Sequence, residues 1–100
     1  MTIKKSVNND EVIIEVEGRV DTNTAKEFET AVKEIPAGTK KLTIDMTGLA
    51  YISSAGLRVL LIANQLMDEY GEVCALNPNN EIREILSITG FDDFLNIVEK

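Results

Sequence analysis

The chain has 100 residues, of which 44% are hydrophobic and 27% are charged, a composition typical of one folded domain. No histidine and only one cysteine are present, which excludes an internal disulfide, a thiolate metal cluster and histidine-dependent catalytic triads. Ten Lys and Arg residues against 17 Asp and Glu residues give a net charge of −7, so nucleic acids and anionic membranes are poor partners. The N-terminus lacks the apolar stretch of a signal peptide, and we expect a cytoplasmic protein.

Two strands open the chain, at residues 2–7 and 11–17. Apolar residues alternate along the second strand, which predicts one buried face carrying Val12, Ile14 and Val16. The Asn-Asn-Asp segment at 8–10 has turn chemistry, so the two strands are predicted to form a hairpin. The segment 18–21 is expected to lead the chain out of the sheet.

After the hairpin, helices and strands alternate, and turn or capping residues separate them. The pattern predicts a helix to about 35 capped by Thr22, Asn23 or Thr24, a strand at 41–46, a loop at 49–54, a helix at 54–70 ending at Gly71, a strand at 73–76, a helix at 80–89 capped from 77–80, a turn at 90–93 and a strand at 95–98. This order favours an α/β domain spanning 1–100, with helices packed against a mixed, mainly parallel sheet of about five strands.

Two adjacent serines, Ser53 and Ser54, lie where the apolar helix at 54–70 begins. One of them can cap the helix, because its hydroxyl accepts a backbone N–H of the first turn. The second serine is not needed for the cap, and a phosphate on it is tolerated at a helix N-terminus. Ala55 and Gly56 are small enough to let another protein approach. The alternative is that both serines serve only as a cap and that Gly56 is a packing glycine.

The segment Tyr51-Ile-Ser-Ser-Ala-Gly-Leu-Arg-Val-Leu-Leu resembles the signature of the STAS domain family, the anti-sigma factor antagonists of bacteria. Three further segments resemble that family: Gly18-Arg-Val-Asp21, Leu42-Thr-Ile-Asp-Met-Thr47 and Ile88-Thr-Gly-Phe91. In the family, the serine two residues before the loop glycine is the phosphoacceptor, which implies Ser54. The family's aspartate falls on Ser53, a departure that makes Ser53 the second choice for modification.

The resemblance implies a binding protein that is not an enzyme and needs no cofactor or metal. Its unphosphorylated form would bind an anti-sigma factor serine kinase and release the sigma factor. Phosphorylation of Ser54 would abolish binding, and a PP2C-type serine phosphatase would reset the switch. The alternative is a non-switching STAS adaptor or sensor module related to transporter-associated or lipid-transport-associated members. In either case we expect a monomer.

The partner surface is predicted to include Ser53, Ser54, Ala55 and Gly56. From Arg58, helical spacing continues through Ile62, Gln65 and Glu69, a stripe expected to face away from the sheet. We therefore place Arg58 and Ile62 in the partner contact, although Ile62 fits a core position equally well.

Asp21 is a further candidate, since it can lie at the same end of the sheet as Ser54 and touch a partner. Its alternative role is a helix cap. Asp45 and Thr47 are too few for a metal site and are interpreted as structural, as is Cys74 in an apolar strand.

Overall fold

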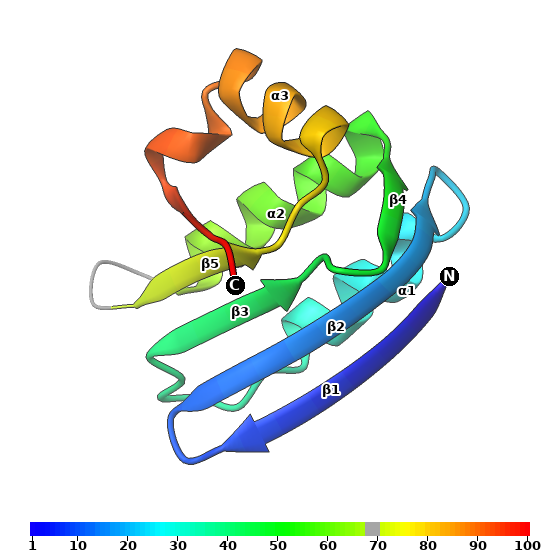
Figure 1. The fold of residues 1–100 in the computed structure, drawn as a ribbon. Helices are drawn as coiled ribbons and strands as arrows, with labels where there is room; N and C mark the ends of the chain where they lie inside the picture. The colour runs from blue at the N-terminus through cyan, green and yellow to red at the C-terminus, as the bar shows by residue number, and fades with distance from the viewer. Residues whose placement is uncertain (68–70) are drawn as a thin grey trace.

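The computed structural model describes residues 1–67 and 71–100. Within these residues, five strands form a sheet in the order β1-β2-β3-β5-β6, and β4 pairs with β2 outside this path. Three α-helices in the described parts of the chain complete the fold (Figure 1). The elements are β1 Thr2–Asn8, β2 Glu11–Val20, α1 Ala25–Lys33, β3 Lys41–Asp45, β4 Leu49–Ile52, α2 Ser54–Leu66, β5 Glu72–Leu76, α3 Asn80–Ile88, a 3-10 turn Phe91–Asp93 and β6 Leu95–Val98.

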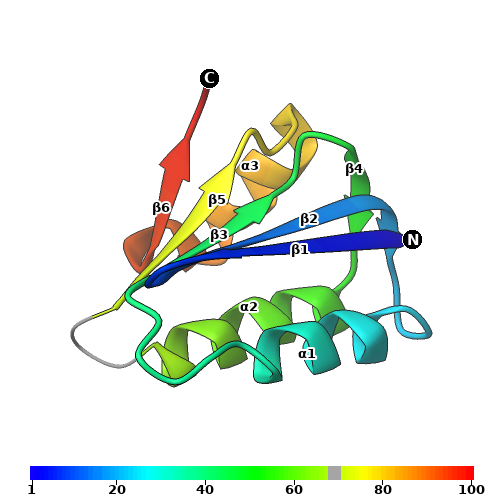
Figure 2. The same cartoon turned by 90° about the horizontal axis from the view of Figure 1, so that it is seen from below.

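The sheet is mixed and mainly parallel, as predicted. β1 and β2 form the antiparallel hairpin, and the pairs β2–β3, β3–β5, β5–β6 and β2–β4 are all parallel. Figure 2 shows α1 and α2 side by side along one face of this sheet. The carboxyl ends of the parallel strands therefore meet at one edge of the sheet, and the loops that follow them lie close together.

The hydrophobic core lies between that face and the helices. Its strand residues are aligned by the register, so that Val12, Leu42, Val73 and Leu95 form one buried row across four strands. All three helices add buried side chains to the same cluster, including Phe28 of α1, Leu60 of α2 and Ile82 of α3. The alternation that predicted one buried face of β2 is confirmed, since Val12, Ile14 and Val16 are each at most 1% exposed.

Two predictions about the region around β2 and β4 are wrong. β2 continues to Val20 instead of leaving the sheet at Gly18, and the predicted loop at 49–54 contains β4. The two differences have one cause: β3 ends its pairing with β2 at Glu15, so the last residues of β2 are free to pair with β4. Burial of Leu49 and Ile52 then holds the short strand in place.

The helix that starts at Ser54 is the element that positions the candidate site. It runs to Leu66 with Met67 as its C-cap, and the predicted continuation towards Gly71 falls on residues 68–70, outside the described residues, as does Glu69 of the predicted stripe. One face is buried, through Gly56, Val59, Leu60 and Ala63. In the parts of the chain that the structure describes, no helix is long and apolar enough to cross a membrane.

Candidate functional site

The two serines lie where β4 passes into α2, beside the end of β2. The backbone N–H of Ser53 donates to the carbonyl of Val20 at 2.8 Å, which continues the β2–β4 pairing by one more bond. Asp21 follows Val20 directly. The structure thus brings Asp21 to the same end of the sheet as the serines, as the sequence suggested.

Ser53 is the helix cap. Its backbone is extended, and its hydroxyl oxygen accepts the backbone N–H of Gly56 at 3.3 Å. This bond satisfies one of the amides that the first turn of a helix leaves without an intrahelical partner. Ser53 is half-buried, and its hydroxyl is already engaged in structure.

Ser54 is the first residue of α2, and its side chain is exposed. Within the described residues, its hydroxyl takes part in no hydrogen bond, in contrast to the hydroxyl of Ser53. No acidic side chain lies in the first turn of α2, so the positive end of the helix dipole is not neutralised there. An exposed hydroxyl at this position can accept a phosphate without loss of a cap.

Gly56 faces the interior, so its place on the predicted partner surface needs correction. It is buried, and a Cβ atom built on it would lie 2.5 Å from Cγ1 of Ile52 and 2.8 Å from Cγ1 of Val20. Both neighbours are themselves buried. Gly56 is the packing glycine of the alternative interpretation: it lets the first turn of α2 rest directly on β2 and β4.

Arg58 and Gln65 of the predicted stripe are exposed, and Ser54 lies on the same exposed side of α2. Leu61, which was not predicted from the sequence as a surface residue, also lies on this side and is 40% exposed. Ile62 is half-buried and is not one of the buried core residues. It therefore lies between the exposed side of α2, where a partner contact was predicted, and the buried side that belongs to the core. The sequence signal that could have placed Leu61 on this side was its spacing from Ser54, because Leu61 lies two helical turns further on.

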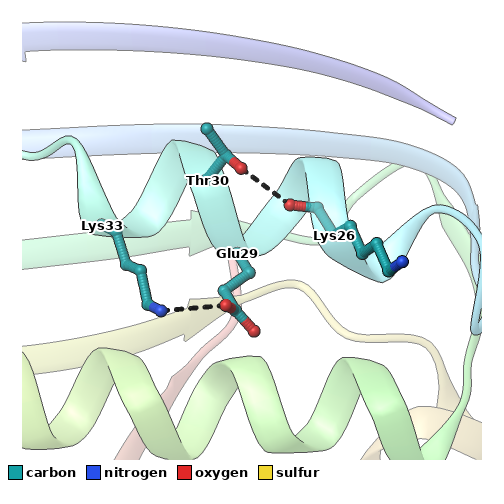
Figure 3. A network of polar contacts seen from close by, with 4 residues as sticks. All are labelled: Lys26, Glu29, Thr30 and Lys33. Atoms are coloured by element: carbon teal, nitrogen blue, oxygen red, sulfur yellow. Dashed lines mark hydrogen bonds and ion pairs between the residues drawn. The ribbon is translucent and has the colours of Figure 1, made fainter.

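Arg58 lies within electrostatic range of the carboxylate of Glu29 on the neighbouring helix α1. Figure 3 shows the Glu29 side chain between the two helices, with Lys33 bound to it at 2.9 Å. The pKa of the Glu29 carboxyl lies below its ordinary value, chiefly because Lys33 donates a hydrogen bond to it, and the positive charges of Lys33 and Arg58 add to this effect against a partial desolvation. Arg58 itself is exposed.

A second arginine lies at the end of the sheet next to the serines. The guanidinium of Arg19 stacks over the ring of Tyr51, 4.4 Å from its centre, across the β2–β4 pair. Tyr51 is 39% exposed. This pair could not be predicted from the sequence, because the contact depends on the pairing of β2 with β4, which was not predicted.

Asp21 organises the turn that leads into α1. Its Oδ1 accepts the backbone N–H groups of Asn23 at 2.9 Å and Thr24 at 3.0 Å. Thr24 occupies the N-cap position, but its hydroxyl does not bond to the helix; it accepts the backbone N–H of Asp21 at 2.8 Å and donates to the carbonyl of Arg19 at 3.0 Å. Of the three predicted caps, Thr24 therefore holds the position, and Asp21 supplies the turn bonds.

These bonds make the turn sensitive to acid. Hydrogen bonds from Thr24 and Asn23, with the charge of Arg19, hold the pKa of Asp21 below its ordinary value despite some desolvation. The stabilisation is therefore present above the unfolded pKa of about 3.9 and is lost as the pH falls through the lower folded value.

In urea unfolding at pH 7 we expect Asp21→Ala to destabilise the protein more than Asp21→Asn, which keeps an acceptor. If wild type and Asp21→Asn differ equally at pH 7 and at pH 2, the charge plays no part.

Asn79 connects α3 to the serine loop from the other side. Its Oδ1 caps α3 through the N–H of Ile82 at 2.9 Å, and its Nδ2 donates to the carbonyl of Leu49 in β4 at 3.3 Å.

Asp45 binds the hydroxyl and N–H of Thr47, which confirms a structural role. Among residues 1–67 and 71–100, no three acidic or cysteine side chains are grouped to hold a metal.

Comparison with known proteins agrees with this architecture. The sequence profile of the STAS domain matches residues 2–100, and the chain belongs to the STAS domain family. A relative from Bordetella bronchiseptica, which carries the name anti-sigma factor antagonist BtrV, is 39% identical over 80 residues, covering 76% of this chain and 67% of the relative.

Two solved structures show the same fold at low sequence identity. An anti-sigma factor antagonist from Mycobacterium paratuberculosis superimposes with a TM-score of 0.87 at 20% identity, covering 97% of this chain and 84% of the other. SpoIIAA of Bacillus in its phosphorylated form gives a TM-score of 0.77 at 15% identity, covering 97% of this chain and 91% of the other. The mixed sheet described above is thus a STAS fold.

Proposed function

We propose that this chain is an anti-sigma factor antagonist that works as a phosphorylation switch. The unmodified chain binds an anti-sigma factor that is itself a serine kinase, and this binding releases the sigma factor. The kinase phosphorylates Ser54, the complex separates, and a PP2C-type serine phosphatase restores the unmodified chain. In this proposal the chain is a cytoplasmic ligand and kinase substrate, and it catalyses no step.

The observation that carries the proposal is that the two serines differ in structural role. Ser53 uses its hydroxyl as the cap of α2, whereas Ser54 is exposed one residue further on. A kinase can therefore reach Ser54 without breaking the cap. The name of the Bordetella relative and the existence of a phosphorylated form of SpoIIAA support the same function.

Local electrostatics are sufficient for the switch. A phosphate adds about −1.5 to −2 charges at neutral pH. In a contact from which water is excluded, it introduces repulsion and a desolvation cost. A loss of about 2.7 kcal/mol in binding free energy lowers affinity about a hundredfold, so no change of fold is required.

The test is a pull-down from native lysate in the presence of ADP, with wild type, Ser54→Asp and Ser53→Asp. We expect wild type to capture an ATPase-like serine kinase and Ser54→Asp to lose it. Ser53→Asp is the matched control, because it adds the same charge one residue away and aspartate is itself a good helix cap.

Other outcomes assign the protein differently. Loss of the kinase with Ser53→Asp alone moves the acceptor to Ser53. Capture of one non-kinase partner by all three proteins contradicts the switch and favours a constitutive STAS adaptor.

A further inference from the structure

We propose that Arg58 is the internal ligand of the phosphate on Ser54. In the phosphorylated chain its guanidinium binds the phosphate and is thereby withdrawn from the partner surface. This inference rests on the proposed function in taking Ser54 as the acceptor. It adds the residue of the chain that senses the modification.

The positions of the two residues carry the first step. Ser54 and Arg58 are four residues apart in the same helix, and both are exposed. Side chains at this spacing lie over one another on one helix face, with Cβ atoms about 5–6 Å apart. An acidic group placed N-terminal to a basic one is the more favourable of the two possible orders. The planar fork of a guanidinium also matches two phosphate oxygens at once.

Arg58 is available for this role. Of the two ion pairs in the described parts of the chain, Lys33–Glu29 and Arg83–Glu99, neither includes it. Its acidic neighbour Glu29 is already bound by Lys33 at 2.9 Å (Figure 3). Arg58 can therefore turn to the phosphate without leaving the Glu29 carboxylate without a counter-charge.

The arrangement gives Arg58 two uses that exclude one another. In the unmodified chain the guanidinium is exposed on the face that carries Leu61 and Gln65, where a partner can bind it. In the phosphorylated chain it is held by the phosphate one turn away. Phosphorylation then changes the partner surface twice, by adding negative charge and by removing a cation.

The test places phosphoserine at position 54 of the full chain by genetic code expansion, in wild type and in Arg58→Gln. The phosphate is titrated by phosphorus NMR. A nearby cation favours the doubly charged phosphate. We therefore expect the titration midpoint of the phosphate to be lower in wild type than in Arg58→Gln by about 0.3 of a pH unit. Arg58→Lys, which keeps the charge but not the fork, is expected to retain part of the difference.

The matched control is Arg83→Gln, which removes an exposed arginine from α3 and is expected to leave the midpoint unchanged. The other charged groups near this end of the molecule are kept in every variant: Lys26 in the first turn of α1, Glu29 with its bound Lys33 further along that helix, and Arg19 and Asp21 at the end of β2. Any difference between wild type and Arg58→Gln is then assigned to Arg58.

Equal midpoints in wild type and Arg58→Gln overturn the inference. An equal shift with Arg83→Gln does the same, because it indicates a general effect of net charge. The result does not depend on recognition by a kinase, since the phosphate is introduced during synthesis. Failure here is therefore distinct from failure of the pull-down, which tests whether Ser54 controls partner binding.

Discussion

Replacing Gly56 with valine is expected to lower the free energy of unfolding by about 3 kcal/mol. The added Cβ would lie 2.5 Å from Cγ1 of Ile52 and 2.8 Å from Cγ1 of Val20. Because both neighbours are buried side chains of strands, the first turn of α2 must move away from the sheet. Urea unfolding followed by circular dichroism measures the loss.

The control is Gln65→Val, which introduces the same side chain at an exposed position of the same helix. Only helix propensity changes there, at a cost of about 0.5 kcal/mol. Equal costs at the two positions contradict the steric explanation. A displaced first turn also moves Ser53 and Ser54, so we expect Gly56→Val to weaken capture of the partner even under conditions where it is folded.

Ile52→Ala is expected to destabilise the protein by about 3 kcal/mol, because it leaves a cavity beneath α2. Ile52 is 2% exposed, and its Cγ1 and Cδ1 atoms fill the space nearest to Gly56. The same urea experiment measures the effect. Ala50→Gly is a control on the same strand, where the side chain is exposed.

The double variant Ile52→Ala with Gly56→Val separates the contributions. The valine can occupy part of the space that the isoleucine leaves, so we expect the combined cost to be at least about 1 kcal/mol smaller than the sum. Strict additivity of the two costs contradicts direct packing of residue 56 on residue 52.

Much of the fold was predictable because most elements have a local signal. The turn residues at 8–10 and the alternation after them predict the hairpin, and β6 has the predicted bounds, Leu95–Val98. β4 was not predictable. Its two end residues are buried and its two central residues are exposed, so a run of four shows no strand period. What makes it a strand is the free end of β2, which is more than 25 residues earlier in the chain.

The site was predictable in composition but not in orientation. The sequence indicated that one serine caps α2, and the structure assigns the cap to Ser53. Most residues in the first half of α2 are apolar, so periodicity does not determine which of Leu61 and Ile62 faces solvent. Packing against the sheet and α1 decides this, and it leaves Leu61 the more exposed. Phosphorylation of Ser54 stays a prediction.

The parallel register also separates the two ends of the molecule. The turn at 36–40 lies between α1 and β3, and the first residue of β3 pairs with the first residue of β2. The serines follow β4, whose last residue pairs with the last residue of β2. The ten residues of β2 span about 30 Å, so a dye on a cysteine introduced at exposed Ala37 lies well away from Ser54. Burial raises the pKa of the native Cys74 thiol, which favours selective labelling of the new cysteine. The chain can thus carry a fluorescent reporter, with which to test partner release, without a change to the proposed partner surface.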